Sequence, residues 1–161
     1  CAGEIPNEWM PELLCIKDYL RKQIEKFGKK AIFYEHGRAG CCIESNPDGS
    51  KCEHFHLHCL PTDISIVLYL NDIFENHKLT SYTDITERFA EEGNYLYFED
   101  RKGDMNFYPA EDKEIESHLL RTMICKALGT PELSNWQNCV DAELYVMNYA
   151  WAKEVLKCAL S

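Results

Sequence analysis

A run of three alternating histidines constrains this chain more than any other feature. Residues 52–61 read CEHFHLHCLP, so every second position from 54 to 58 is a histidine and a proline closes the run. Successive side chains of a β-strand point to opposite faces, so the alternation predicts a strand with one imidazole face and one apolar face. The imidazole face carries His54, His56 and His58, and the apolar face carries Phe55, Leu57 and Cys59.

The middle histidine, His56, is the candidate nucleophile. A neutral imidazole nitrogen can attack phosphorus and form a covalent phosphoramidate, which splits one difficult displacement into two easier ones. On an extended strand the rings of His54 and His58 lie roughly 6.5–7 Å from it, close enough to bind phosphate oxygens or orient the nucleophile. Two alternatives stay open. One is a half-exposed strand whose histidines share no role, and the other is zinc held by a neighbouring pair, since His54 and His58, roughly 13 Å apart, cannot both reach one ion.

The run resembles the motif of the histidine-triad (HIT-like) superfamily of nucleotide-binding hydrolases and transferases, His-x-His-x-His-x-x with x apolar, over residues 54–60. The resemblance extends back to residues 32–37 (IFYEHG), where Glu35 stands at a position that is Asn in many members. It extends forward from residue 119 to Trp136, which is similar to the tail of larger members, including a splicing-associated group. The resemblance implies an α+β fold: an antiparallel sheet with flanking helices and a C-terminal helical extension.

The resemblance also implies roles for individual residues around a nucleotidylated His56. The segment just before the triad contacts the phosphate or the leaving group in the family, and Lys51 there would stabilise charge on a departing phosphate. Arg121 lies in an apolar stretch and either pairs with a buried carboxylate or reaches a phosphate. The expected phosphate-binding residues are His54, His58, Ser50, Lys51 and Arg121.

The start of the chain departs from the family pattern. In the family a β-hairpin, an acidic residue that binds ribose and a Pro-Gly-His stretch precede the helix before the triad, whereas this sequence opens almost at that helix. We therefore expect a fragment of a longer protein, with a minimal domain as the alternative. Over residues 1–161 we expect one HIT-like domain, with a core at about 8–62 and a C-terminal hairpin and helical extension at about 63–161.

Hydrophobic periodicity and turn residues divide the chain into elements. The apolar spacing over 8–28 predicts an amphipathic helix that ends at Gly28, and further helices are expected at about 63–76, 82–92, 112–128 and 135–158. A short strand at 31–35 should pair antiparallel with the triad strand. Two β-prone runs, 95–99 and 105–108, flank turn residues and predict a hairpin.

Charge and cysteine usage limit the partners and the compartment. A net charge of −10 argues against non-specific binding of nucleic acid, whose affinity depends on Lys and Arg, but it leaves room for a small nucleotide. No apolar run reaches the roughly 18–20 residues that span a bilayer. Most of the nine cysteines fall in helical or strand-like apolar patterns, which favours free thiols in a cytoplasmic protein. A zinc knuckle that uses Cys41, Cys42 and Cys52 is a less economical alternative.

The sequence therefore predicts a nucleoside-phosphate hydrolase or nucleotidyltransferase that acts through a nucleotidyl-histidine intermediate. Its partner would be a small-molecule nucleotide, with no membrane, no cofactor and no metal, and the resemblance allows a homodimer. The alternatives are a non-catalytic HIT-like interaction scaffold and a zinc-binding module.

Overall fold

The computed structural model of this chain describes residues 1–40, 55–111 and 113–135. Several predicted features lie outside the described residues. They are His54, Ser50, Lys51, the cysteines at 41, 42 and 52, and the helix expected at 135–158 from residue 136 onward.

Within the described part the chain forms four α-helices, five strands and two short 3-10 helices, so the expected α+β class is confirmed. In chain order the elements are η1 (Ala2–Glu4), α1 (Met10–Lys26), β1 (Ala31–Gly37), β2 (His58–Pro61), α2 (Val67–Asn71), β3 (His77–Leu79), α3 (Asp84–Glu92), β4 (Tyr95–Glu99), β5 (Met105–Pro109), α4 (Leu119–Ala127) and η2 (Pro131–Ser134).

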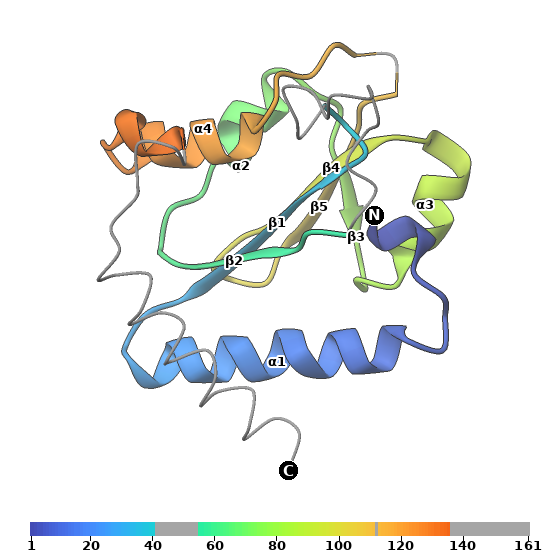
Figure 1. Cartoon of the computed structure of the whole chain (residues 1–161), viewed down its shortest axis with the longest axis horizontal. Coiled ribbons are helices and arrows are strands. Elements are labelled where there is room, and N and C mark those ends of the chain that lie inside the picture. Colours follow the sequence, from blue (N-terminus) through green and yellow to red (C-terminus); the bar gives the residue numbers. More distant parts are fainter. Residues whose placement is uncertain (41–54, 112, 136–161) are drawn as a thin grey trace, which may run out of the picture.

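The five strands form one antiparallel sheet in the order β2-β1-β4-β5-β3 (Figure 1). The predicted pairing of the first strand with the triad strand is confirmed, with Tyr34 opposite His58 and Ala31 opposite Pro61. The predicted hairpin forms β4 and β5 and lies in the middle of this sheet, because β4 also pairs with β1. The boundary expected near residue 63 therefore separates strands that belong to the same sheet.

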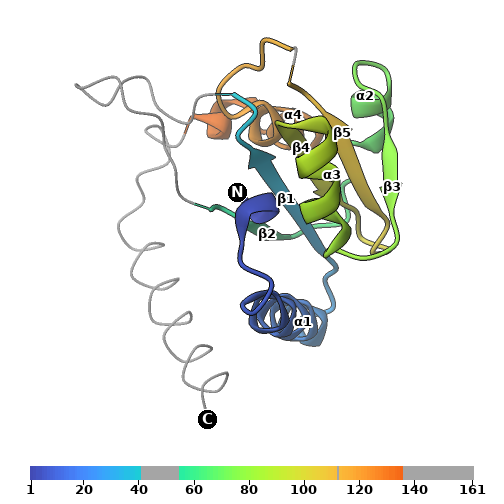
Figure 2. The same ribbon diagram turned by 90° about the vertical axis from the view of Figure 1, so that its right-hand side faces the viewer.

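Helices cover both faces of the sheet, with α1 on one side and α2 and α4 on the other (Figure 1). On the α1 face, η1 lies beside α3, and a β-carbon added to Gly3 would meet the Phe89 side chain at 2.4 Å (Figure 2). On the α4 face, Leu120 and Ile124 pack on strand residues such as Ile32 and Phe98. The two apolar layers make a core that holds β1 and β4 from both sides.

Local signals explain several element ends. Gly28 and Gly93 follow α1 and α3 with positive φ angles of 69° and 72°, as expected for glycine after a helix. Two predicted helices are shorter than expected: α2 spans Val67–Asn71 instead of 63–76, and α4 begins at Leu119 instead of 112. The segment after α2 forms β3, which was not predicted because three residues are too few to show a strand period. None of the helices in the described ranges combines the length and the apolar content that crossing a membrane requires.

Candidate active site

Strand β2 carries the candidate site along the edge of the sheet. Tyr34 on β1 lies opposite His58, and the two rings stack with centroids 4.5 Å apart and planes 7° apart. Because Tyr34 belongs to the core layer under α4, the stack places His58 on the α4 face of the sheet. The neighbouring Cys59 packs against the opposite layer, as the alternation predicts.

His56 precedes β2 and lies next to His58. The two ring centroids are 6.3 Å apart, with the planes at 73°, and both side chains are exposed. Phe55 and Leu57 pack against the α1 side of the core, so the predicted division into an apolar and an imidazole face is confirmed from residue 55 onward. The regular strand is shorter than predicted, since it begins only at His58.

His36 joins β1 to the start of α4. Its Nδ1 lies 3.0 Å from the carbonyl oxygen of Ala39, and the backbone N–H of Leu120 donates to its Nε2 over 3.2 Å. A carbonyl can only accept, so Nδ1 carries the proton and Nε2 is the acceptor, which defines a neutral ring. Burial of this ring lowers the pKa of His36 to about 4.

Arg121, on the first turn of α4, pairs with no buried carboxylate among the residues that the structure describes. Its Nη2 donates to the carbonyl oxygen of Leu133 over 3.0 Å, which corrects that alternative. The positive charge of Arg121 acts on the site, because it opposes the effect of burial on the pKa of Tyr34, which still rises to about 12. The pKa of His58 is lowered first by the partial burial of its ring and then by its electrostatic interactions with His56, Arg121 and His118. A lowered pKa favours the neutral form of His58 at neutral pH, in which one ring nitrogen still carries a proton to donate.

A groove of about 520 Å³ lies between α1 and the segment that leads into β2. Its walls are mainly apolar and include Leu13, Leu20, Phe33 and Phe55. The two histidines, His56 and His58, border the same groove. The apolar walls of the groove belong to the α1 face of the sheet, whereas the ring of His58 stacks on Tyr34 on the α4 face.

Glu35, on β1, does not belong to this site. Strand alternation turns it toward η1, where its Oε1 accepts a hydrogen bond of 2.7 Å from the backbone N–H of Ala2. Its other oxygen has no hydrogen-bond partner among the described residues. Burial raises the pKa of Glu35 to about 7.

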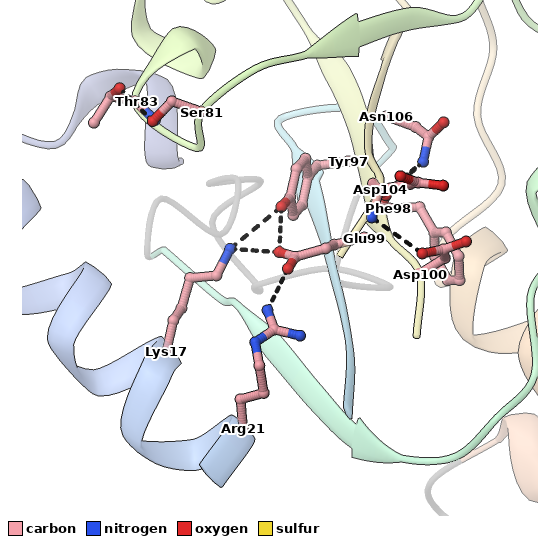
Figure 3. A network of polar contacts seen from close by, with 10 residues as sticks. All are labelled: Lys17, Arg21, Ser81, Thr83, Tyr97, Phe98, Glu99, Asp100, Asp104 and Asn106. Carbon is pink, nitrogen blue, oxygen red and sulfur yellow. Dashed lines mark hydrogen bonds and ion pairs between the residues drawn. The ribbon is translucent and has the colours of Figure 1, made fainter. Parts of the chain in front are cut away.

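Sequence reasoning missed a buried ionic cluster between α1 and β4 (Figure 3). Lys17 Nζ lies 2.7 Å from Glu99 Oε2, and the Tyr97 hydroxyl donates to the same oxygen over 2.6 Å. Arg21 pairs with the other carboxylate oxygen of Glu99. Lys17 and Arg21 are four residues apart on one helix face, which was the available signal. The cluster is close-packed and satisfied, and it secures α1 to the sheet.

The thiols of Cys1, Cys15, Cys59 and Cys125 are free. Among the residues that the structure describes, no three His, Cys, Asp or Glu side chains gather as a metal site. The zinc alternatives that use His54 or residues 41–52 lie outside the described ranges.

No protein-family model and no curated protein matches this chain. The resemblance to histidine-triad proteins therefore rests on the sequence motif.

Proposed function

We propose that this chain is a HIT-like enzyme that transfers or hydrolyses a nucleoside phosphate through a covalent nucleotidyl-histidine. The observation that supports the proposal most directly is the pair of exposed imidazoles, His56 and His58, with ring centroids 6.3 Å apart at the edge of the sheet.

In the first step one ring nitrogen of His56 attacks the α-phosphorus. A P–N bond forms as the P–O bond to the leaving group breaks, and the leaving group keeps the electron pair. His58 and the positive charge of Arg121 stabilise the phosphate oxygens as negative charge develops on them. In the second step water forms a new P–O bond and releases its proton to solvent, and the electrons of the P–N bond return to His56. In a transferase, a phosphate group takes the place of water.

Other parts of the proposal come from the motif. His54 would hold phosphate oxygens as His58 does, and Ser50 and Lys51 would meet the phosphate or the leaving group. The substrate would be a mononucleotide and not a nucleic acid, because the net charge is −10. The chain would act in the cytoplasm, and a homodimer would fit the family resemblance.

The direct test is to trap the covalent intermediate. Wild-type protein is mixed with a panel of nucleoside triphosphates radiolabelled at the α-phosphate and quenched rapidly, and the labelled peptide is identified. We expect label on His56 and none on the His56→Asn variant, whose turnover should fall by several orders of magnitude while nucleotide binding survives. His58→Asn should cost about tenfold to a hundredfold, as expected for one hydrogen bond to a charged group.

The matched control is His77→Asn, which makes the same replacement on β3, away from the site, and should label like the wild type. Wild-type turnover by His56→Asn would contradict the covalent mechanism. Absence of both label and nucleotide binding in the wild type would instead favour a non-catalytic scaffold, for which the apolar groove would be the docking surface.

A further inference from the structure

The backbone of His118 is strained at a position next to the candidate site. Its φ angle is 61°, in the left-handed region that residues other than glycine rarely adopt. His118 is the N-cap residue of α4, but its side chain makes no capping hydrogen bond. No capping hydrogen bond from this side chain therefore offsets the free-energy cost of the conformation. Strain of this kind concentrates at binding and catalytic sites.

The turn after β1 holds the chain in place around His118. Leu120, two residues further on, donates its backbone N–H to His36. A β-carbon added to Gly40 would meet the backbone oxygens of Ile115 and Glu116 at 3.1 Å and 3.2 Å, so the turn also packs closely on the segment before α4. These contacts fix the start of α4 on both sides of His118.

Strand β1 connects His36, which binds the start of α4, to the candidate site. His36 is two residues along β1 from Tyr34, so their side chains lie on one face of the strand. Tyr34 in turn stacks on His58. The half-buried His118 is thus brought to the histidine face of the sheet, close enough for its electrostatic interaction to contribute, after burial, to the lowered pKa values of both His36 and His58.

We propose that His118 is a further phosphate-binding residue of the histidine site, and that His36 is the positioning residue that holds it there. This inference rests on the proposed function, since it assigns His118 to the phosphate of that substrate. A neutral imidazole at position 36 suits the role, because it accepts from Leu120 and donates to Ala39 without adding charge to an anion site.

The first experiment separates strain from function with His118→Gly. Glycine adopts the left-handed region without strain, so the melting temperature should equal or exceed that of the wild type. Binding of inorganic phosphate and of adenosine monophosphate, measured by titration calorimetry, should weaken by about tenfold or more because a hydrogen bond to a charged group is lost. His118→Asn, which also tolerates the left-handed region, repeats the comparison with another side chain.

Arg38 provides the matched control, because it is the other non-glycine residue with a positive φ angle in the described ranges, at 62°. Arg38→Gly should likewise keep the fold but leave phosphate affinity unchanged. Phosphate binding by His118→Gly at the wild-type affinity would overturn the proposal, and so would a wild type that binds neither probe.

The second experiment separates the two hydrogen bonds of His36. The Gln amide reaches the position of Nε2 and keeps the acceptor for Leu120, whereas the Asn amide reaches the position of Nδ1 and keeps only the bond to Ala39. His36→Gln should bind phosphate almost as the wild type does, and His36→Asn should show the loss seen in His118→Gly. In His36→Asn the pKa of His58, followed by NMR, should also rise, because the electrostatic effect of His118 on His58 weakens as His118 moves away. Equal behaviour of the two variants would remove His36 from its positioning role.

The two proposals fail separately. If no nucleotide labels His56 but His118→Gly still loses phosphate affinity, the covalent mechanism is wrong and the phosphate site remains. If label appears on His56 while phosphate affinity does not depend on His118, the mechanism stands and this inference is wrong.

Discussion

One residue type is used in different protonation states at different places in this chain. His36 is neutral because it is buried and its two nitrogens are committed to a carbonyl oxygen and a backbone N–H. The pKa of His58 is lowered by the partial burial of its ring and by electrostatic interactions with its neighbours, among them Arg121. His77 has the opposite environment, since carboxylates contact both of its nitrogens. The sequence shows six histidines, and only their surroundings decide which are charged.

We predict that His77 stabilises the fold in acid. Its Nε2 lies 3.1 Å from Glu75 and its Nδ1 lies 2.9 Å from Glu92, and these hydrogen bonds raise the pKa of His77 above 6.5. A raised histidine pKa means stability that is fully present below the unfolded-state value and is lost as pH rises through the folded-state value. Thermal melts should show His77→Asn destabilised most at pH values below about 6 and least above about pH 8.

The control is His58→Asn, because the pKa of His58 is shifted the other way. Relative to the wild type, this variant should gain stability as the pH falls, since an imidazole with a lowered pKa resists protonation in the folded state. The same pH trend in both variants would contradict the assignment.

At the scale of elements, the attachment of α1 to the sheet combines apolar packing with one buried ionic cluster. Lys17 and Glu99 are 6% and 3% exposed, so neither charge is compensated by water. Lys17 also lies over the ring of Tyr82, with its Nζ 3.7 Å from the ring centroid. Burial lowers the pKa of Lys17, and the carboxylate of Glu99 opposes that shift. The pair therefore specifies which face of α1 meets β4.

We predict that Glu99→Gln costs about 3–5 kcal/mol of folding free energy, because it leaves the buried Lys17 without its carboxylate. The matched control is Asp18→Asn, which breaks an exposed pair with Lys22 on the same helix and should leave the free energy of unfolding almost unchanged. Urea unfolding of both variants gives the comparison. Similar losses in the two would show that burial of the cluster does not matter.

At the scale of the whole molecule, the sheet is assembled from distant parts of the chain. Strand β1 pairs with β2 on one side and with β4 on the other, so it is the strand on which both halves of the chain meet. Glu35 lies on this strand, 1% exposed, and holds the backbone of Ala2 in η1. Because this buried carboxyl group lies where the two halves of the chain meet, its ionisation should make the stability of the fold depend on pH.

We predict that ionisation of Glu35 destabilises the fold. Burial raises its pKa from 4.5 to about 7, so the stabilising contribution of the protonated group is present below pH 4.5 and is lost as pH rises toward and beyond 7. At pH 8 the cost of the charge is on the order of 3 kcal/mol. Glu35→Gln cannot ionise, so its stability relative to the wild type should increase between pH 5 and pH 8 in urea unfolding. A difference independent of pH would contradict the shift.

The sequence alone determined features that depend on near neighbours along the chain. Alternation from residue 55 placed Phe55 and Leu57 toward the core and His56 beside His58, and the helical spacing before Gly28 gave α1. Turn residues gave the hairpin of β4 and β5, where Asp100 accepts backbone hydrogen bonds from the turn. Hydrophobic periods and turn preferences are local properties, so they can be inferred without knowing what each element packs against.

Only the tertiary structure decided which distant groups meet. The hairpin is central in the sheet and not an appendage because β4 pairs with β1. The stack of Tyr34 on His58, the bond from Leu120 to His36 and the pairing of Lys17 with Glu99 each join residues separated by more than twenty positions. Such contacts, and the pKa shifts that follow from them, depend on how the layers close over one another, and no local pattern encodes that distance or the loss of water that goes with it.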